Sequence, residues 1–472
     1  MILLAAAALL FDIVIANGRV LDPETRLDAP RHIGIKDGRI AAISPTPLQG
    51  KLVLDAKGRV VAPGFIDMHA HGQSPEANEY QAHDGVTTAL ELEVGVPNVA
   101  RFLESRKGKA ILNYGATVSH GGARAMAMKA FAAKHASWQS IADLGFEAYN
   151  TARYNSLADA EELSTLAANL ERGLREGAVG LGLAPQYYPG ATPDEVFRVF
   201  QMAARWRVPV FMHVRSMTPA AMQEAIADAT ASRAALHIVH VNSMSLGNLP
   251  LVLDLIDGAR ARGVDITTEA YPYTAASTFL ESAMFDDGWQ QRLGIDYGDL
   301  QWQDTGERLT KETFEKYRQK GGIVIMHMMK PEWIRRAMAS PFVMIGSDGM
   351  PFSPRAHPRS AGTFARVLGL YVREEKAVSL MDALAKMTIG PAKRLEPIAP
   401  AMRNKGRIKV GADADITVFD PATVRDKADF QSGLKFSEGI HHVLVNGVPV
   451  VRDGQTVKGA FPGRAVTGNF RP

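Results

Sequence analysis

Residues 62–72 read Ala62-Pro63-Gly64-Phe65-Ile66-Asp67-Met68-His69-Ala70-His71-Gly72, an apolar run that ends in two histidines and a glycine. If this run ends as a β-strand, residues two apart point to the same side, so both imidazoles face one point. Two convergent imidazoles are suitable ligands for a borderline divalent metal such as zinc. The pattern therefore predicts a metal site at the end of a strand.

The composition is that of an ordinary globular protein, with 46% apolar and 22% charged residues among 472. The 53 basic and 50 acidic residues leave a net charge of +3, which does not indicate a nucleic-acid-binding surface. The chain has no cysteine, which excludes disulfides, thiolate metal ligands and cysteine nucleophiles. We expect a small-molecule substrate, no nucleic-acid partner, and a monomer or homo-oligomer.

The N-terminal stretch, Met1 to Phe11, is apolar and rich in alanine but has no positively charged start. It is too short to span a bilayer, so we expect no membrane association. Two interpretations remain open. The protein is cytoplasmic and the stretch extends the first strand, or the stretch is the remnant of an export signal and the protein is periplasmic or secreted.

Both chain ends carry strand–turn–strand signals, because Asn-Gly and Asp-Gly adopt the positive φ angles of tight hairpins. These signals predict one small β-sandwich domain formed by residues 1–62 and 396–472, with a further short strand at 414–420. The three signals are Asn17-Gly18 within Ile13 to Leu21, Asp37-Gly38 within Ile33 to Ile40, and Asn446-Gly447 within Val443 to Val450.

Between the ends, short apolar runs alternate with segments of helical character, which predicts a (β/α)8 TIM barrel over residues 63–395. The expected parallel strands include 179–183, 208–212, 235–241, 323–326 and 342–345, and the expected helices include 158–176, 193–206 and 219–231. Residues 279–322 interrupt this alternation with a polar stretch whose pattern predicts no strand. We interpret it as an insertion that covers the site as a lid.

In such a barrel the chemistry lies at the C-terminal ends of the strands. Glu91 and Glu93 share one face of the second strand, and Glu93 lies nearer the catalytic end, so we choose it as a ligand over the deeper Glu91. His237 lies three residues before His240 and has the opposite parity, so we expect it to be a hydrogen-bonded histidine that faces the helices. The complete predicted ligand set for one or two divalent metals, with Glu93 able to bridge, is His69, His71, Glu93, His213, His240 and Asp348.

With these motifs, the chain resembles the amidohydrolase superfamily and, within it, the D-aminoacylase (N-acyl-D-amino-acid deacylase) group. The resemblance extends over nearly the whole chain, and its combination of motifs is specific. The supporting stretches are Pro63 to His71, Gly85 to Thr88, Tyr271 to Ala275, Ile345 to Gly349, His357 to Arg359, Gly362 to Gly369, Met387-Thr388 with Pro391-Ala392, and Lys405 to Ile408 with Gly411 to Asp415.

The resemblance implies a metal-bearing barrel flanked by a β-sandwich, and a role for each matching residue. His69 and His71 with Asp348 resemble the ligands of one metal, and His213 and His240 resemble those of the other. Asp348 resembles the general acid and base. Arg359 resembles the arginine that binds the substrate carboxylate, and Tyr271 or Tyr273 resembles a tyrosine of the site.

Two positions depart from this group. D-aminoacylases use a cysteine near the end of the second strand, where this chain has Glu93, although glutamate serves that position elsewhere in the superfamily. Asn242 occupies a position where a lysine often helps to bind the substrate. The residues that we predict to contact substrate are Arg359, Tyr271, Tyr273, Asn242, Tyr187, Ser277 and His327, with Tyr187 and Tyr188 equally able to pack under the lid.

The predicted function is zinc-dependent hydrolysis of a linear amide beside a free carboxylate, with an N-acyl-amino acid as substrate and one or two zinc ions per subunit. Asp348 would take a proton from the attacking water and return it to the departing amine. The alternatives are a dipeptidase, a cyclic amidase, or an amidase for aromatic amide conjugates such as mycotoxins. A non-catalytic barrel scaffold is the most distant alternative.

Overall fold

The computed structural model describes residues 10–132, 153–157 and 159–470 of the chain. The interpretation of the apolar N-terminal stretch therefore concerns residues that lie almost entirely outside the described part. Within the described residues, no helix combines the length and apolar character needed to cross a membrane.

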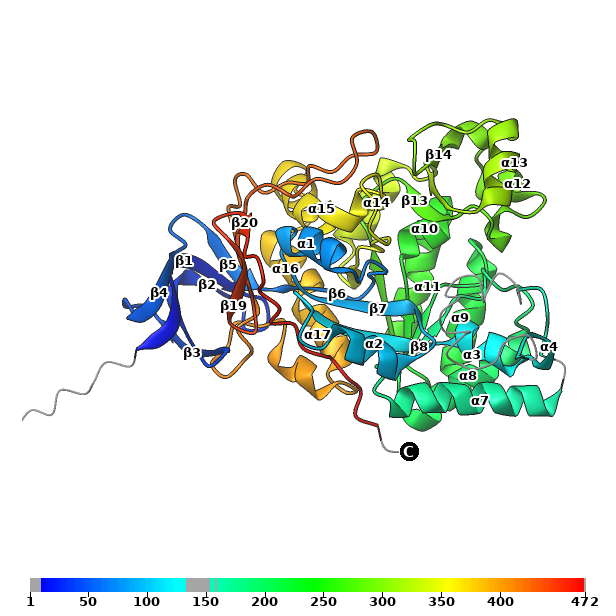
Figure 1. The fold of residues 1–472 in the computed structure, drawn as a ribbon, viewed down its shortest axis with the longest axis horizontal. Coiled ribbons are helices and arrows are strands. Elements are labelled where there is room, and N and C mark those ends of the chain that lie inside the picture. Colours follow the sequence, from blue (N-terminus) through cyan, green and yellow to red (C-terminus); the bar gives the residue numbers. More distant parts are fainter. Residues whose placement is uncertain (1–9, 133–152, 158, 471–472) are drawn as a thin grey trace, which may run out of the picture.

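Eight parallel strands form the centre of the molecule (Figure 1), in the order β16-β12-β11-β10-β9-β8-β7-β6. A bridge between Ala70 and Gly349, just beyond the ends of β6 and β16, brings the two edges together. The predicted (β/α)8 barrel is confirmed. The strands are β6 (Phe65–Asp67), β7 (Val86–Val96), β8 (Asn113–Ser119), β9 (Leu181–Leu183), β10 (Val210–Met212), β11 (Leu236–Ile238), β12 (Ile266–Ala270) and β16 (Val343–Ile345).

Several helices around the barrel begin at a residue whose side chain caps the first turn. Helix α8 (Pro193–Trp206) has the bounds expected from its sequence, because the Thr192 side chain accepts a hydrogen bond from Glu195 N and Pro193 opens the first turn. The other described barrel helices are α1 (Pro75–His83), α2 (Val99–Arg106), α3 (His120–Ala127), α4 (Lys129–Ala132), α7 (Ala160–Arg175), α9 (Pro219–Ser232), α10 (Val241–Ser245), α11 (Leu249–Ala261), α14 (Pro331–Ala339), α15 (Arg359–Arg366), α16 (Leu380–Met387) and α17 (Ile389–Leu395), with the single-turn or irregular η1 (Leu246–Asn248), η4 (Val367–Glu374) and η5 (Pro400–Asn404).

The insertion differs from the sequence-based expectation in two respects. Residues 323–326 form β15 (Ile323–Met326), which is not a barrel strand but the centre of a small antiparallel sheet with β13 (Ala276–Phe279) and β14 (Leu300–Trp302). The insertion also contains a strand, β14, contrary to the prediction. A four-residue apolar run is compatible with either kind of sheet, so its pattern alone could not decide. Helices η2 (Ala283–Phe285), α12 (Trp289–Leu293), η3 (Tyr297–Asp299) and α13 (Lys311–Lys320) complete the insertion.

The two chain ends build a second sheet beside the barrel, with blue and red strands adjoining in Figure 1. Hydrogen bonds join nine strands in the order β20-β19-β18-β17-β5-β1-β2-β3, with β4 paired to β1, and the two ends meet where β5 pairs with β17. The strands are β1 (Phe11–Asp22), β2 (Leu27–Lys36), β3 (Arg39–Ser44), β4 (Gly50–Asp55), β5 (Val60–Pro63), β17 (Ile416–Phe419), β18 (Ile440–Val445), β19 (Val448–Arg452) and β20 (Gln455–Thr456).

Two of the three predicted hairpin turns are confirmed. Asp37-Gly38 and Asn446-Gly447 both have positive φ angles and connect antiparallel neighbours. The prediction is wrong at Asn17, whose φ is +62°, because β1 continues through it and the register against β2 shifts between Ile15 and Gly18. A left-handed residue within a paired strand makes a β-bulge rather than a turn.

Candidate metal centre

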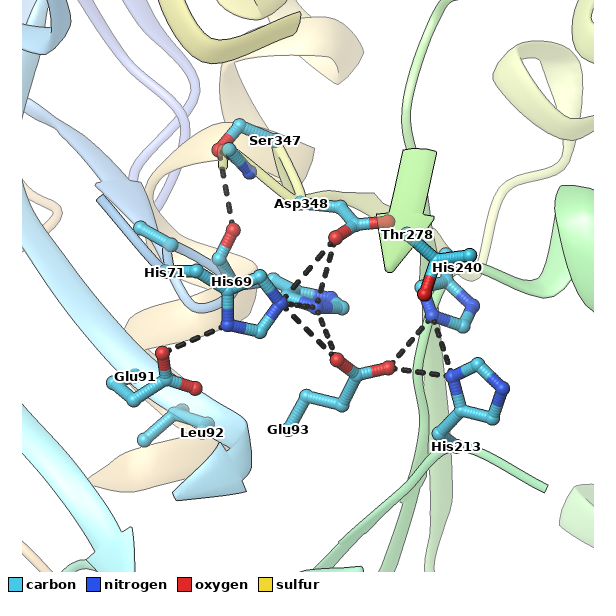
Figure 2. A network of polar contacts seen from close by, with 12 residues as sticks. His69, His71, Glu91, Leu92, Glu93, His213, His240, Thr278, Ser347 and Asp348 are labelled. Atoms are coloured by element: carbon cyan, nitrogen blue, oxygen red, sulfur yellow. Dashed lines mark hydrogen bonds and ion pairs between the residues drawn. The ribbon is translucent and has the colours of Figure 1, made fainter. Parts of the chain in front are cut away.

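The first ligand cluster joins the ends of three barrel strands. The Nε2 atoms of His69 and His71 lie 3.3 Å apart, and each lies 3.4 Å from Oδ1 of Asp348. Oε2 of Glu93 lies 3.2 Å and 3.1 Å from the same two nitrogens (Figure 2). Four ligand atoms from distant parts of the chain thus converge on one point.

The second cluster shares one of these residues. The other carboxylate oxygen of Glu93, Oε1, lies 2.7 Å from Nδ1 of His213 and 2.7 Å from Nε2 of His240. Figure 2 shows the Glu93 carboxylate between the two groups of histidines, with one oxygen directed to each. Glu93 therefore has the geometry of a bridging ligand.

The backbone turns two of these ligands into the barrel. His240 and Asp348 are non-glycine residues with positive φ angles, +29° and +52°, in the segments that follow strands β11 and β16. Such conformations cost about 1–3 kcal/mol each and are concentrated at functional sites. The segment of Asp348 is held by Ser347, whose backbone N–H donates to Asp67 at 3.0 Å and whose hydroxyl donates to the same carboxylate.

A second carboxylate lies behind each histidine of the first cluster. Nδ1 of His69 lies 2.5 Å from Glu269 Oε1, and Nδ1 of His71 lies 2.8 Å from Glu91 Oε2. When Nδ1–H donates to a carboxylate, the ring is fixed in the tautomer whose Nε2 lone pair is free to bind a metal. Both Nε2 atoms point into the cluster, so the donor set fits a divalent cation.

The electrostatics of the cluster also favour a cation. Burial works to lower the pKa of His69, but the neighbouring carboxylates, Asp348 foremost, raise it well above its usual value. Burial works to raise the pKa of Glu93, but the adjacent histidines, His69 foremost, hold it well below its usual range. Positive charge is therefore stabilised between these groups, where a divalent ion would supply it.

Glu269 is a functional residue that the sequence analysis missed. It is the penultimate residue of β12, is 1% exposed, and packs so closely on Gly346 that a Cβ there would lie 2.5 Å from its carboxylate. A carboxylate near the end of the run Ile266 to Ala270 was the available signal. Gln186 was also missed, and its Oε1 lies 2.6 Å from Nε2 of His213.

We expect Glu269→Gln to weaken zinc binding about 10- to 100-fold, because a neutral amide holds the His69 ring less strongly and makes it less basic. The measurement is competitive titration of zinc against a chelator of known affinity. Glu195→Gln is a matched control, since Glu195 is 2% exposed and pairs with Arg124 and His120 away from the cluster. Equal zinc affinity of Glu269→Gln and the unaltered protein would contradict this role.

His237 does not face the helices, so the expected direction is wrong. Its ring contacts residues of neighbouring strands: Nδ1 lies 2.8 Å from Thr267 Oγ1, and Nε2 lies 3.4 Å from Glu269 Oε2. The parity argument failed because β11 ends at Ile238 and the positive φ of His240 reverses the alternation. His237 thus shares the carboxylate that supports His69.

A cavity of about 300 Å³ opens onto both clusters and is covered in part by the insertion, through Phe279 and Met284. Two residues predicted to contact substrate, Tyr187 and Ser277, line it, whereas Tyr188 is buried against His120. His327 lines a different cavity, where it pairs with Gln301. The cavity therefore lies between the ligand clusters and the inserted segment.

The remaining predicted contacts lie behind the cavity wall. Arg359 is 1% exposed, with Nη1 2.9 Å from Asp348 Oδ2 and its guanidinium 4.6 Å from the centre of the Tyr271 ring. Tyr273 donates to Asp426 at 3.0 Å, and Asn242 donates to the carbonyl of Tyr271 at 3.2 Å. Of these four residues, Arg359 is the one with a direct ion pair to a candidate metal ligand, Asp348.

A parallel barrel whose strand ends present two histidine–carboxylate clusters defines the class of metal-dependent hydrolases. Residues 52–451 match the model of the amidohydrolase family, and the chain belongs to that family. The enzyme is accordingly a hydrolase that acts on carbon–nitrogen amide bonds. The sequence-based assignment to this superfamily is confirmed.

Similar proteins include an N-acyl-D-glutamate deacylase of Alcaligenes xylosoxydans xylosoxydans, which is 31% identical over 93% of each chain. A D-aminoacylase from the same organism is 29% identical over 97% of each chain. Among solved structures, the N-acyl-D-glutamate deacylase of Bordetella bronchiseptica, in complex with zinc and a phosphonate inhibitor, has a TM-score of 0.82 and 27% identity over 97% of this chain and 100% of that one. A D-aminoacylase structure described as having a binuclear metal centre has a TM-score of 0.81 and 25% identity over the same shares.

Proposed function

We propose that this enzyme is a zinc-dependent deacylase of N-acyl-D-amino acids, which hydrolyses a linear amide whose amine half carries a free carboxylate. The observation that carries the proposal is a group of buried polar atoms without partners beside Asp348. Among the described residues, no hydrogen-bond partner is found for Nε of Arg359 or Oγ of Ser277. The similarity to N-acyl-D-amino-acid deacylases supports this choice.

Such unpartnered atoms favour a polar ligand. Each buried donor without an acceptor costs about 1–3 kcal/mol, and a substrate carboxylate would remove that cost. An arginine fork binds a carboxylate through two parallel hydrogen bonds. Arg359 is paired with Asp348 Oδ2, so a carboxylate that binds this guanidinium would displace Asp348 and release its oxygen for chemistry.

In this proposal, one set of side chains holds the metals and Oδ2 of Asp348 transfers the proton. His69, His71, Glu93, His213, His240 and Oδ1 of Asp348 would hold the metals, which would lower the pKa of a water molecule and polarise the scissile carbonyl. Oδ2 of Asp348, once released from Arg359, accepts a proton from the attacking water and returns it to the departing nitrogen. Because Asp348 lies beside Arg359, the proton is delivered next to the carboxylate that has taken its place on the guanidinium.

The test is a substrate panel on zinc-loaded enzyme of measured metal content. The panel contains N-acetyl and N-hexanoyl derivatives of D- and L-amino acids, their methyl esters, dipeptides, hydantoins and aryl amides. We expect hydrolysis of the D-acids, with kcat/KM about 10- to 100-fold higher than for the methyl esters, which cannot form a charged pair with Arg359. Hydrolysis confined to dipeptides, cyclic amides or aryl amides would replace the proposal with that activity.

A further inference from the structure

The cavity above the metal clusters has a markedly apolar wall. Its methionines come from five different segments and surround the space between the ligands and the insertion. None of the described residues that line it is a lysine or an arginine. The methionines are Met217, Met244, Met284, Met326, Met328 and Met350. Such side chains are flexible and polarisable, and they adapt to apolar groups of varied shape.

The following step rests on the proposed function, because it uses the orientation of the substrate. Asp348 returns a proton to the departing nitrogen, so the amine half of the substrate lies beside Asp348 and Arg359. The acyl group is attached to the other side of the scissile carbon and must extend away from that pair. Asp348 lines the methionine-rich cavity whereas Arg359 is not among its described lining residues, so we place the acyl group against the methionine wall.

A second cavity adjoins the first one. Met217 follows β10, and Met284 lies in η2 of the insertion. Both of these residues line a second, more polar cavity of about 370 Å³, whose wall includes Pro189 and Leu293 but also Arg215, Asp286 and Arg292. The two spaces therefore adjoin at a pair of flexible side chains, one of which, Met284, is 4% exposed.

We propose that this cavity is an acyl-chain site, which selects apolar acyl groups of about six to eight carbons, and that Met217 and Met284 mark its outer boundary. Cavities of about 300 Å³ and above enclose ligands of drug-like size, so a two-carbon acetyl group leaves most of this space unfilled. A longer chain gains by burying methylenes against the methionines. An acidic acyl group finds no lysine or arginine in the described wall.

The first experiment is a chain-length series on the zinc-loaded enzyme. The amino acid is held constant, as the D-amino acid most readily hydrolysed, while the acyl group is acetyl, butanoyl, hexanoyl, octanoyl or succinyl. We expect kcat/KM to rise about threefold to fourfold per methylene, so that hexanoyl exceeds acetyl by at least about 50-fold. We expect succinyl, which is acidic, to be slower than butanoyl.

The outcomes separate the two proposals. A flat or falling series, with the acetyl compound hydrolysed, would overturn the acyl-chain site and leave the deacylase proposal standing. Failure of every member of the series would overturn both. A rising series with the optimum at six to eight carbons supports the acyl-chain site.

Variants at the boundary provide the second readout. Met217 is only half-buried on a loop, so Met217→Trp is tolerated by the fold and fills the space between the two cavities. We expect the octanoyl-to-acetyl ratio of kcat/KM to fall at least about tenfold in this variant, whereas the matched control Met217→Leu keeps a similar volume and should change the ratio less than about threefold. Met284→Ala should raise the ratio by opening the boundary. Unchanged ratios in both Met217→Trp and Met284→Ala would overturn the proposed boundary.

Discussion

Asp348→Asn is expected to reduce kcat for amide hydrolysis by at least about 1,000-fold while the protein keeps its metal. The asparagine side chain has nearly the same shape, and its amide oxygen can take the place of Oδ1 beside His69 and His71. The amide cannot accept a proton at neutral pH, so it neither takes a proton from the attacking water nor returns one to the departing nitrogen. The measurement pairs steady-state kinetics with elemental analysis of the same preparation.

A matched control for this substitution is Asp84→Asn. The Asp84 carboxylate is also buried, but it accepts hydrogen bonds from the backbone of Phe364 and Ala365 in α15, away from the ligands. Its variant should retain kcat per folded molecule even if its thermal stability falls. Turnover by metal-replete Asp348→Asn within tenfold of the unaltered enzyme would show that another group transfers the proton.

The convergence of the candidate ligands could be predicted from the sequence because of a property of parallel barrels. All strands end at the same rim, so polar residues that follow apolar runs meet in space although they are far apart in the chain. His69, Glu93 and Asp348 are separated by as many as 279 residues in sequence, yet their ligand atoms lie within 4.8 Å of one another. Their convergence required only the assignment of the strands, not their detailed geometry.

Features that depend on local backbone angles could not be predicted. The alternation rule placed His237 and His240 on opposite faces, but the positive φ at His240 ends the alternation. Asn17 has the sequence of a hairpin turn and the position of a bulge, because pairing of β1 with β2 on both sides of it outweighs the local signal.

The composition of a strand also misled the sequence analysis. The residues of β12, Ile266-Thr267-Thr268-Glu269-Ala270, include a carboxylate and two threonines, so the run is not apolar enough to indicate a buried strand. The more apolar Ile323–Met326 was assigned to the barrel instead. The polar character of β12 is explained by the site, because Glu269 is there to support His69. Polar functional residues thus weaken the hydrophobic pattern by which their own strand would be predicted.

Glu93→Ala is expected to lower the metal content by about one ion per chain, because this carboxylate is the residue shared by both clusters. Without it, the second site keeps only His213 and His240, whereas catalytic zinc sites have three protein ligands as a rule. The first site keeps His69, His71 and Asp348 and should still bind an ion. The measurement is elemental analysis after dialysis against buffer free of metal, with folding checked by circular dichroism.

Two further variants show whether the loss reflects ligation. Glu91→Gln changes a carboxylate two residues away whose hydrogen-bond partner within the described part of the chain is His71, so it should weaken binding without removing a site at saturating zinc. Glu93→Cys introduces a thiolate, which is a strong zinc ligand and the residue used at this position by the D-aminoacylase group that the chain resembles, so it should restore a second ion. If Glu93→Ala instead retains the full metal content of the unaltered protein, Glu93 is not a ligand, and its contacts with the four histidines serve only to neutralise their charge. That result would leave the second site with two histidines of the cluster, and its ion would require a further ligand from outside it.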